Sequence, residues 1–125
     1  MEKILFIEET EETPLIKLDS ESGLMEISGR SLPENASSFF EPVHKWLSDY
    51  LSNPAINTTM HLKLEYFNSS SAKQIMQIIL LFEQLHLKSN NVKILWFYSQ
   101  TDELIESRGR ELKNLVNIPF ELTQF

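Results

Sequence analysis

The chain reads Thr58-Thr59-Met60-His61-Leu62-Lys63-Leu64-Glu65-Tyr66-Phe67 near its middle, and apolar residues recur there at every second position. Side chains of a β-strand point alternately to its two faces. One face would carry Met60, Leu62, Leu64 and Tyr66, and the other His61, Lys63 and Glu65. The alternation predicts a strand with one buried side.

Apolar residues recur at helical spacing on both sides of this strand. Before it, three- and four-residue steps link Phe39, Val43, Trp46, Leu47, Tyr50 and Leu51. We expect a helix from about Asn35 to Leu51, bent or restarted near Pro42, with Ser31 and Glu34 as a capping box or Asn35 as the cap. After the strand, a deeply packed helix is predicted by Ile75, Ile78, Ile79, Phe82 and Leu85. A turn is expected at Ser89-Asn90-Asn91.

The rest of the chain supplies further strands and one more helix. Strands are predicted at Ile4 to Ile7, Leu15 to Leu18 and Leu24 to Ser28, the last two joined by a turn over residues 19–23. Val92 to Tyr98 is apolar on both faces except for Lys93, which is typical of a central strand covered on both sides. A helix capped by Ser99 or Thr101 would follow, before a strand from Phe120 to Gln124. One side of that helix would carry Leu104, Ile105, Arg108, Leu112 and Leu115.

This order of elements predicts an α/β fold. Strands that alternate with helices form parallel pairs joined by right-handed crossovers. We expect a mixed sheet, with an antiparallel hairpin at its start, parallel strands after it, and helices covering at least one face. A chain of 125 residues without a visible linker has the size of one domain, so residues 1–125 are predicted to form a single domain.

Composition excludes several functional classes. The formal net charge is -7, from 18 acidic and 11 basic side chains, which argues against binding nucleic acid. Without cysteine, disulfides, thiolate catalysis and Cys-based zinc sites are excluded. The longest apolar run, Ile78 to Phe82, is too short for a membrane span. No secretory apolar segment is visible, so a cytoplasmic protein without membrane contact is expected.

No catalytic or metal-binding motif is apparent. The three histidines, His44, His61 and His86, do not share ligand spacing on one helix. Gly29-Arg30-Ser31-Leu32-Pro33 lacks the second glycine of a nucleophile elbow, and only three glycines are present, too few for a phosphate-binding loop. We therefore expect no enzyme activity, no metal and no cofactor.

The segment Asn68-Ser69-Ser70-Ser71-Ala72-Lys73-Gln74 stands out at a predicted strand-to-helix junction. Ser71 and Gln74 have the spacing of a capping box, which leaves Ser69 and Ser70 without a role. If Ser71 is the cap, Lys73 lies in the first turn, where a cation is disfavoured. A phosphate on Ser69 would make that lysine favourable, because helix N-termini and lysine both attract anions.

Several stretches, in this order, carry a resemblance to a known family. They are Thr13-Pro14, the Gly23 turn, Gly29-Arg30-Ser31-Leu32-Pro33-Glu34-Asn35-Ala36 with Phe40, Pro42, Trp46 and Tyr50, then residues 64–73, Trp96-Phe97-Tyr98 and Pro119-Phe120-Glu121. In these the chain resembles the SiaC family of bacterial regulatory phosphoproteins. That family has a STAS-like fold similar to that of anti-anti-sigma factors.

The resemblance implies a partner-switching protein. A serine/threonine kinase of the anti-sigma type would phosphorylate the loop, a PP2C-type phosphatase would reverse this, and the unmodified form would bind a diguanylate cyclase and promote cyclic-di-GMP synthesis. The modified hydroxyl follows the loop asparagine, which assigns it to Ser69, where family members often carry Thr. Ser70 and Ser71 are the alternates. The predicted partner-binding residues are Asn68, Ser69, Ser70, Ser71 and Lys73.

The sequence differs from the family in one further place, and two alternatives stay open. Family members are rich in acids where this chain reads Ser99-Gln100-Thr101-Asp102-Glu103, which favours a different partner surface. The chain could keep the fold but serve another partner, such as a sigma-factor regulator. It could also be a ligand-binding or enzymatic domain with a pocket around Arg30, His61 and Lys73. The sequence leaves open whether phosphorylation promotes or releases binding.

Overall fold

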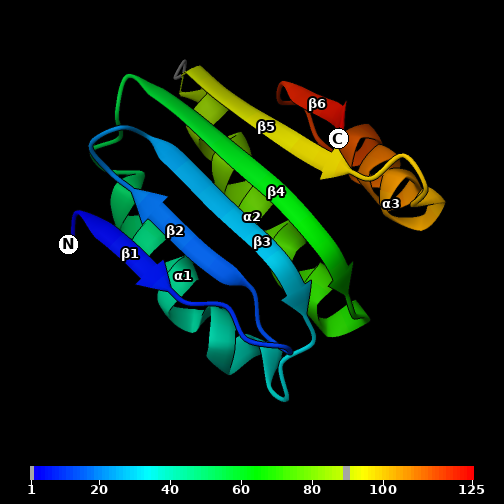
Figure 1. The fold of residues 1–125 in the computed structure, drawn as a ribbon. Helices are drawn as coiled ribbons and strands as arrows, with labels where there is room; N and C mark the ends of the chain where they lie inside the picture. The colour runs from blue at the N-terminus through cyan, green and yellow to red at the C-terminus, as the bar shows by residue number, and fades with distance from the viewer. Residues whose placement is uncertain (1, 89–90) are drawn as a thin grey trace.

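A computed structural model describes residues 2–88 and 91–125 of the chain. Strands and helices follow one another along these residues (Figure 1), in the order β1 (Ile4–Ile7), β2 (Leu15–Asp19), β3 (Leu24–Ser31), α1 (Ala36–Tyr50), β4 (Asn57–Phe67), α2 (Ser69–Leu87), β5 (Asn91–Tyr98), α3 (Glu103–Leu115) and β6 (Phe120–Gln124). Of the turn expected at Ser89-Asn90-Asn91, the first two residues lie outside the described part, and Asn91 begins β5.

The six strands that the described residues form make one mixed sheet in the order β1-β2-β3-β4-β5-β6. The pairs β1–β2 and β2–β3 are antiparallel, whereas β3–β4, β4–β5 and β5–β6 are parallel. In the view of Figure 1, α1 and α2 lie side by side behind the sheet and α3 lies at its β5–β6 side. The predicted α/β class, with an antiparallel hairpin before parallel strands, is confirmed.

The core lies between the sheet and the helices, because strand residues at matching register point to the same face. Ile27, Leu62 and Trp96 occupy successive paired positions across β3, β4 and β5, and all are fully buried. Helices contribute Phe40, Val43 and Tyr50 from α1 and Ile75, Ile78, Ile79, Phe82 and Leu85 from α2. The deep packing predicted for the helix after β4 is therefore confirmed.

The opposite face of the sheet carries both polar and apolar side chains, and no helix of the described residues covers it (Figure 1). Glu26, His61 and Leu95 pair across β3, β4 and β5, and all three are half-buried. Phe97 is also half-buried and lies edge-on to His61, with ring centroids 5.3 Å apart. The prediction that β5 is covered on both sides is therefore wrong. Its outer apolar side chains are shielded by neighbouring side chains of the same face, not by a second layer.

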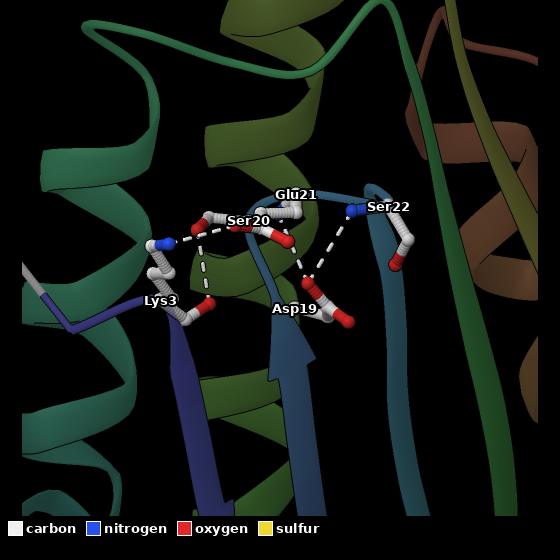
Figure 2. Close-up of polar contacts among 5 residues, drawn as sticks. All are labelled: Lys3, Asp19, Ser20, Glu21 and Ser22. Carbon is white, nitrogen blue, oxygen red and sulfur yellow. Dashed lines mark hydrogen bonds and ion pairs between the residues drawn. The ribbon is translucent and has the colours of Figure 1, made fainter.

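The turn between β2 and β3 is held by one aspartate (Figure 2). The Asp19 carboxylate accepts hydrogen bonds from the backbone N–H groups of Glu21 (2.9 Å) and Ser22 (3.3 Å). These bonds, the Ser22 one first, lower the pKa of Asp19. Lys3 pairs with Glu21 at 2.9 Å and so connects the first residues of the chain to this turn.

Helix α1 begins at Asn35, one of the two predicted caps. The Asn35 side chain accepts a 3.1 Å hydrogen bond from the backbone N–H of Ser38. The alternative cap, Ser31, is buried at the end of β3 and does not cap. The helix continues through Pro42 without a second start. An interior proline costs about 3 kcal/mol, and burial of the apolar stripe offsets it.

Helix α3 is capped by Asp102, whose side chain accepts from the backbone N–H of Ile105 (3.0 Å), so the caps predicted at Ser99 and Thr101 are wrong. Its buried side is formed by Ile105 and Gly109. The indole N–H of Trp96 donates to the Ile105 carbonyl (2.9 Å), and a Cβ at position 109 would overlap the Trp96 ring. Of the residues predicted to share one side of this helix, Ile105 is buried, whereas Leu104 and Leu115 are 58% and 68% exposed.

Candidate functional site

A single residue, Asn68, connects β4 to α2. Its side-chain oxygen accepts hydrogen bonds from the backbone N–H of Ser71 (2.9 Å) and from the hydroxyl of Ser70 (3.1 Å). Its backbone is extended, as in other N-cap residues. Asn68 is therefore the cap of α2, and the predicted capping box of Ser71 and Gln74 is wrong.

Gln74 is therefore not part of a capping box, and Lys73 does not lie in the first turn of the helix. Gln74 is buried, and its side-chain oxygen lies 2.6 Å from Nε2 of His44 on α1. Lys73 lies past the first turn with an exposed side chain. Because the effect of the helix dipole falls off within the first turn, the unfavourable position expected for Lys73 does not arise.

The three serines after Asn68 differ in what their hydroxyl groups can do. Ser71 is 0% exposed and accepts a 2.8 Å hydrogen bond from the Ser31 hydroxyl. Ser70 is exposed but donates its hydroxyl hydrogen to Asn68. Ser69 is exposed, and its hydroxyl has no hydrogen-bond partner in the described part of the chain. Ser71, predicted as an alternate phosphorylation site and a partner-binding residue, thus has no exposed surface, which leaves Ser69 and Ser70 as the exposed hydroxyls of this segment.

A bulge near the end of β4 changes which side chains face outward. The pairing of β3 with β4 shifts between Gly29 and Arg30, so that Arg30 pairs with Tyr66 and Ser31 with Phe67. Tyr66 is 41% exposed, with the Arg30 guanidinium 5.7 Å from its ring centroid. Phe67 turns inward and packs edge-on against Trp96 (5.9 Å between centroids). The prediction that Tyr66 shares the buried face of the strand is therefore wrong.

A cleft of about 370 Å³ opens beside Ser69. Its walls come from the start of α2 and from α3, and the end of β4 forms its floor; we call it the α2–α3 cleft. The lining residues are Tyr66, Phe67, Asn68, Ser69, Ala72, Leu104, Ile105 and Arg108. It joins a free hydroxyl, an exposed apolar side chain and a guanidinium in one hollow, which suits the docking of a protein surface.

The rival pocket around Arg30, His61 and Lys73 does not form. Arg30 lies over Tyr66 at the end of β3. His61 lies on the helix-free face of the sheet, and Lys73 on α2, which packs against the other face. None of the larger cavities in the described part of the chain is lined by more than one of the three.

A second cavity, of about 430 Å³, lies where the helix-free face meets the end of β5. Its acidic side chains, Glu9, Glu26, Glu65 and Asp102, surround Lys63, whose ammonium lies 4.4 Å from the Phe125 ring centroid. Over residues 2–88 and 91–125, no three acidic or histidine side chains come together as a metal site. Within the same residues, no helix is both long and apolar enough to cross a bilayer.

The sequence profile described as "SiaC family regulatory phosphoprotein" matches residues 7–125. The chain belongs to the SiaC family. It is 30% identical over 118 residues to an uncharacterized protein of Pseudomonas aeruginosa strain UCBPP-PA14, with 94% of each chain covered. The fold and the family inferred from sequence are thus confirmed together.

Solved structures of the SiaC family match along nearly the whole chain. SiaC of Pseudomonas aeruginosa superposes with a TM-score of 0.90 at 29% identity, over 98% of both chains. A second match, with a TM-score of 0.92 and 30% identity, covers 97% of this chain and 99% of the other. That structure is of the diguanylate cyclase SiaD in complex with its activator SiaC from Pseudomonas aeruginosa.

Sequence reasoning missed the α3 side of the cleft. It grouped Leu104 and Arg108 on one side of the helix with Ile105, but did not predict that both side chains are exposed and line the same cleft as Ser69. The signal that could have found them is Gly109. A glycine inside a helix indicates close approach of another chain segment, so the buried stripe must run through position 109. Its i−4 neighbour, Ile105, then faces inward and Leu104 and Arg108 turn toward α2.

Proposed function

We propose that this chain is a non-enzymatic regulatory protein that switches partners when Ser69 is phosphorylated. A serine/threonine kinase of the anti-sigma type adds the phosphate and a PP2C-type phosphatase removes it. The unmodified form binds a diguanylate cyclase, and phosphorylation releases it. Membership of a family of regulatory phosphoproteins and the relative seen with its cyclase support this assignment.

The observation that carries the choice of residue is the contrast between three neighbouring hydroxyls. Ser71 is buried and Ser70 is hydrogen-bonded to the cap, whereas Ser69 is exposed and its oxygen has no hydrogen-bond partner among residues 2–88 and 91–125. A kinase can transfer phosphate to Ser69 without first breaking a hydrogen bond of that hydroxyl. Its position at the first residue of α2 also favours the product, because free amides and the helix dipole stabilise an anion there.

The same position explains why a phosphate would disturb docking. Phosphorylation adds about -1.5 to -2 charges and three strongly hydrated oxygens at the edge of the α2–α3 cleft. A partner seated there would have to remove water from that charge. In a chain whose net charge is already -7, the modification also strengthens repulsion of acidic partners. We therefore assign the unmodified state as the binding state.

Site-resolved phosphorylation tests this proposal. The chain is co-expressed with a serine/threonine kinase of the anti-sigma type from the same organism, and the phosphopeptides are mapped by mass spectrometry. One phosphate is expected on the wild type and on Ser70→Ala, and none on Ser69→Ala. Ser70→Ala is the matched control, because it removes the adjacent hydroxyl on the same exposed turn. Phosphate retained at full level by Ser69→Ala would overturn the assignment.

A further inference from the structure

Arg108 and Ser69 line the same cleft from opposite helices. Ser69 is the first residue of α2, and Arg108 lies in the middle of α3. The guanidinium is half-exposed and makes one ion pair within the described residues, to Glu111 at 3.7 Å. That separation is too long for a hydrogen bond. The donors of Arg108 are therefore free to bind an anion that enters the cleft.

The neighbouring arginine is arranged differently. Arg110 donates a 2.7 Å hydrogen bond to the Glu106 carboxylate one turn earlier on the same helix. It does not line the cleft. The helix thus carries two arginines close in sequence: Arg110 is hydrogen-bonded to an acid, whereas Arg108 has only the longer Glu111 contact and lines the same cleft as Ser69.

A guanidinium group is well suited to bind a phosphate monoester. Its planar set of N–H donors binds two phosphate oxygens at once, whereas a lysine ammonium acts as a single point charge. The cleft also carries the apolar side chains of Leu104, Ile105 and Phe67, and a charge pair is stronger beside apolar groups than in open water. Lys73 is four residues from Ser69 on α2, but does not line the cleft.

We infer that the guanidinium of Arg108 binds the phosphate of modified Ser69. Phosphorylation would then link α2 to α3 and place the phosphate in the cleft. This inference rests on the proposed function and gives it a mechanism. The phosphate of the chain itself occupies the hollow in which the partner would otherwise dock. Other charged groups near the site are Lys73, which adds attraction, and Glu65 and Glu111, which oppose it.

The test installs phosphoserine at position 69 during translation, so no kinase is needed. Phosphorus NMR then follows the second ionisation of the phosphate, whose pKa is about 6 when the group is free in water. In the wild type, Arg108 should lower this pKa by about half a unit to one unit, because a cation favours the dianion. Arg108→Gln should move the pKa most of the way back toward the free value of about 6, and Arg108→Lys should leave it between the wild-type and Arg108→Gln values, since the charge stays and the planar fork is lost.

Arg110→Gln is the matched control and should leave the titration unchanged, while Lys73→Gln should produce a smaller shift than Arg108→Gln. The inference is overturned if Arg108→Gln titrates like the wild type, or if Lys73→Gln alone abolishes the shift. Thermal unfolding of each variant checks that the fold is intact. A failure of the kinase to modify Ser69 would refute the proposed function and leave this measurement unaffected, so the two failures are distinguishable.

Discussion

The hydroxyl of Ser31 donates a hydrogen bond to the hydroxyl of Ser71 at 2.8 Å, and neither side chain is exposed to solvent. The bond links the end of β3 to the first turn of α2. The backbone N–H of Asn68 adds a second link by donating to the Ser31 carbonyl (3.1 Å). The turn that presents Ser69 is therefore anchored to the sheet directly beneath it, which holds the free hydroxyl in a fixed place.

This buried pair predicts a coupled effect on stability. Ser31→Ala or Ser71→Ala alone should lower the free energy of unfolding by about 1–3 kcal/mol, because each leaves a buried hydroxyl without its partner. The double variant should cost clearly less than the sum of the two, since no unpaired group remains. Urea denaturation of the four proteins measures this. Ser69→Ala, at an exposed position, should change stability by less than about 0.5 kcal/mol, and additive losses in the pair would contradict the link.

Gly109→Ala tests the packing of α3 on Trp96. Alanine normally stabilises an exposed helix position by about 1 kcal/mol relative to glycine. Here the new Cβ would lie 2.5 Å from the indole nitrogen of Trp96 and 2.7 Å from Leu122 Cδ2, so we expect a loss of about 1–3 kcal/mol by overpacking. Ser107→Ala, on the exposed side of the same helix, should be neutral or slightly stabilising. Both effects are read from urea denaturation, and a more stable Gly109→Ala would show that the close approach is wrong.

Asp19, in the turn between β2 and β3, should make a pH-dependent contribution to the stability of the fold. Hydrogen bonds from the backbone of Ser22 and Glu21 lower the pKa of Asp19 in the folded state. A lowered pKa gives stability that is present above the unfolded value of about 3.9 and is lost as pH falls through the folded value. The difference in Tm between the wild type and Asp19→Asn should therefore shrink below about pH 4. Thermal melts from neutral to acidic pH measure it, and a difference that is constant over this range would exclude the titration.

Two exposed leucines of α3 allow an effect on partner docking to be distinguished from an effect on folding. Leu104 borders the α2–α3 cleft and Leu115 lies at the far end of the helix, although both are largely exposed. Leu104→Glu should weaken binding of the unmodified protein to the proposed cyclase partner by about tenfold or more, as expected when an apolar side chain is lost from an interface. Leu115→Glu should bind normally. Biolayer interferometry with immobilised cyclase gives both affinities, and equal losses in the two variants would place the interface elsewhere.

The fold followed from periodicity, whereas the details of the site depended on contacts between distant segments. Alternation in residues 58–67 predicted β4, but not the bulge that turns Tyr66 outward, because the bulge arises from the pairing with Gly29 and Arg30. Asn68, Ser69, Ser70 and Ser71 all have side chains that can cap a helix. Asn68 is the cap because the Ser71 hydroxyl is hydrogen-bonded to Ser31, which lies at the end of β3. The sequence around residues 68–71 does not indicate that contact, because Ser31 is 40 residues away along the chain.

The same reasoning explains the error at α3. The helix was correctly predicted, but Leu104 and Leu115, which were grouped on one side with Ile105, do not share its burial: both leucines are exposed. The helix packs through Ile105 and Gly109 because the large Trp96 ring fills the space against which it lies. The size of a facing side chain on another element decides which stripe is buried, and periodicity within the helix does not report it.

The central claim is that a phosphate on Ser69 releases the partner that binds the unmodified chain. Its most direct test is a titration of the cyclase with the unmodified protein and with protein that carries phosphoserine at position 69. The account predicts that the phosphate raises Kd by about tenfold or more, equivalent to about 1.4 kcal/mol. Equal Kd values for the two forms would contradict it.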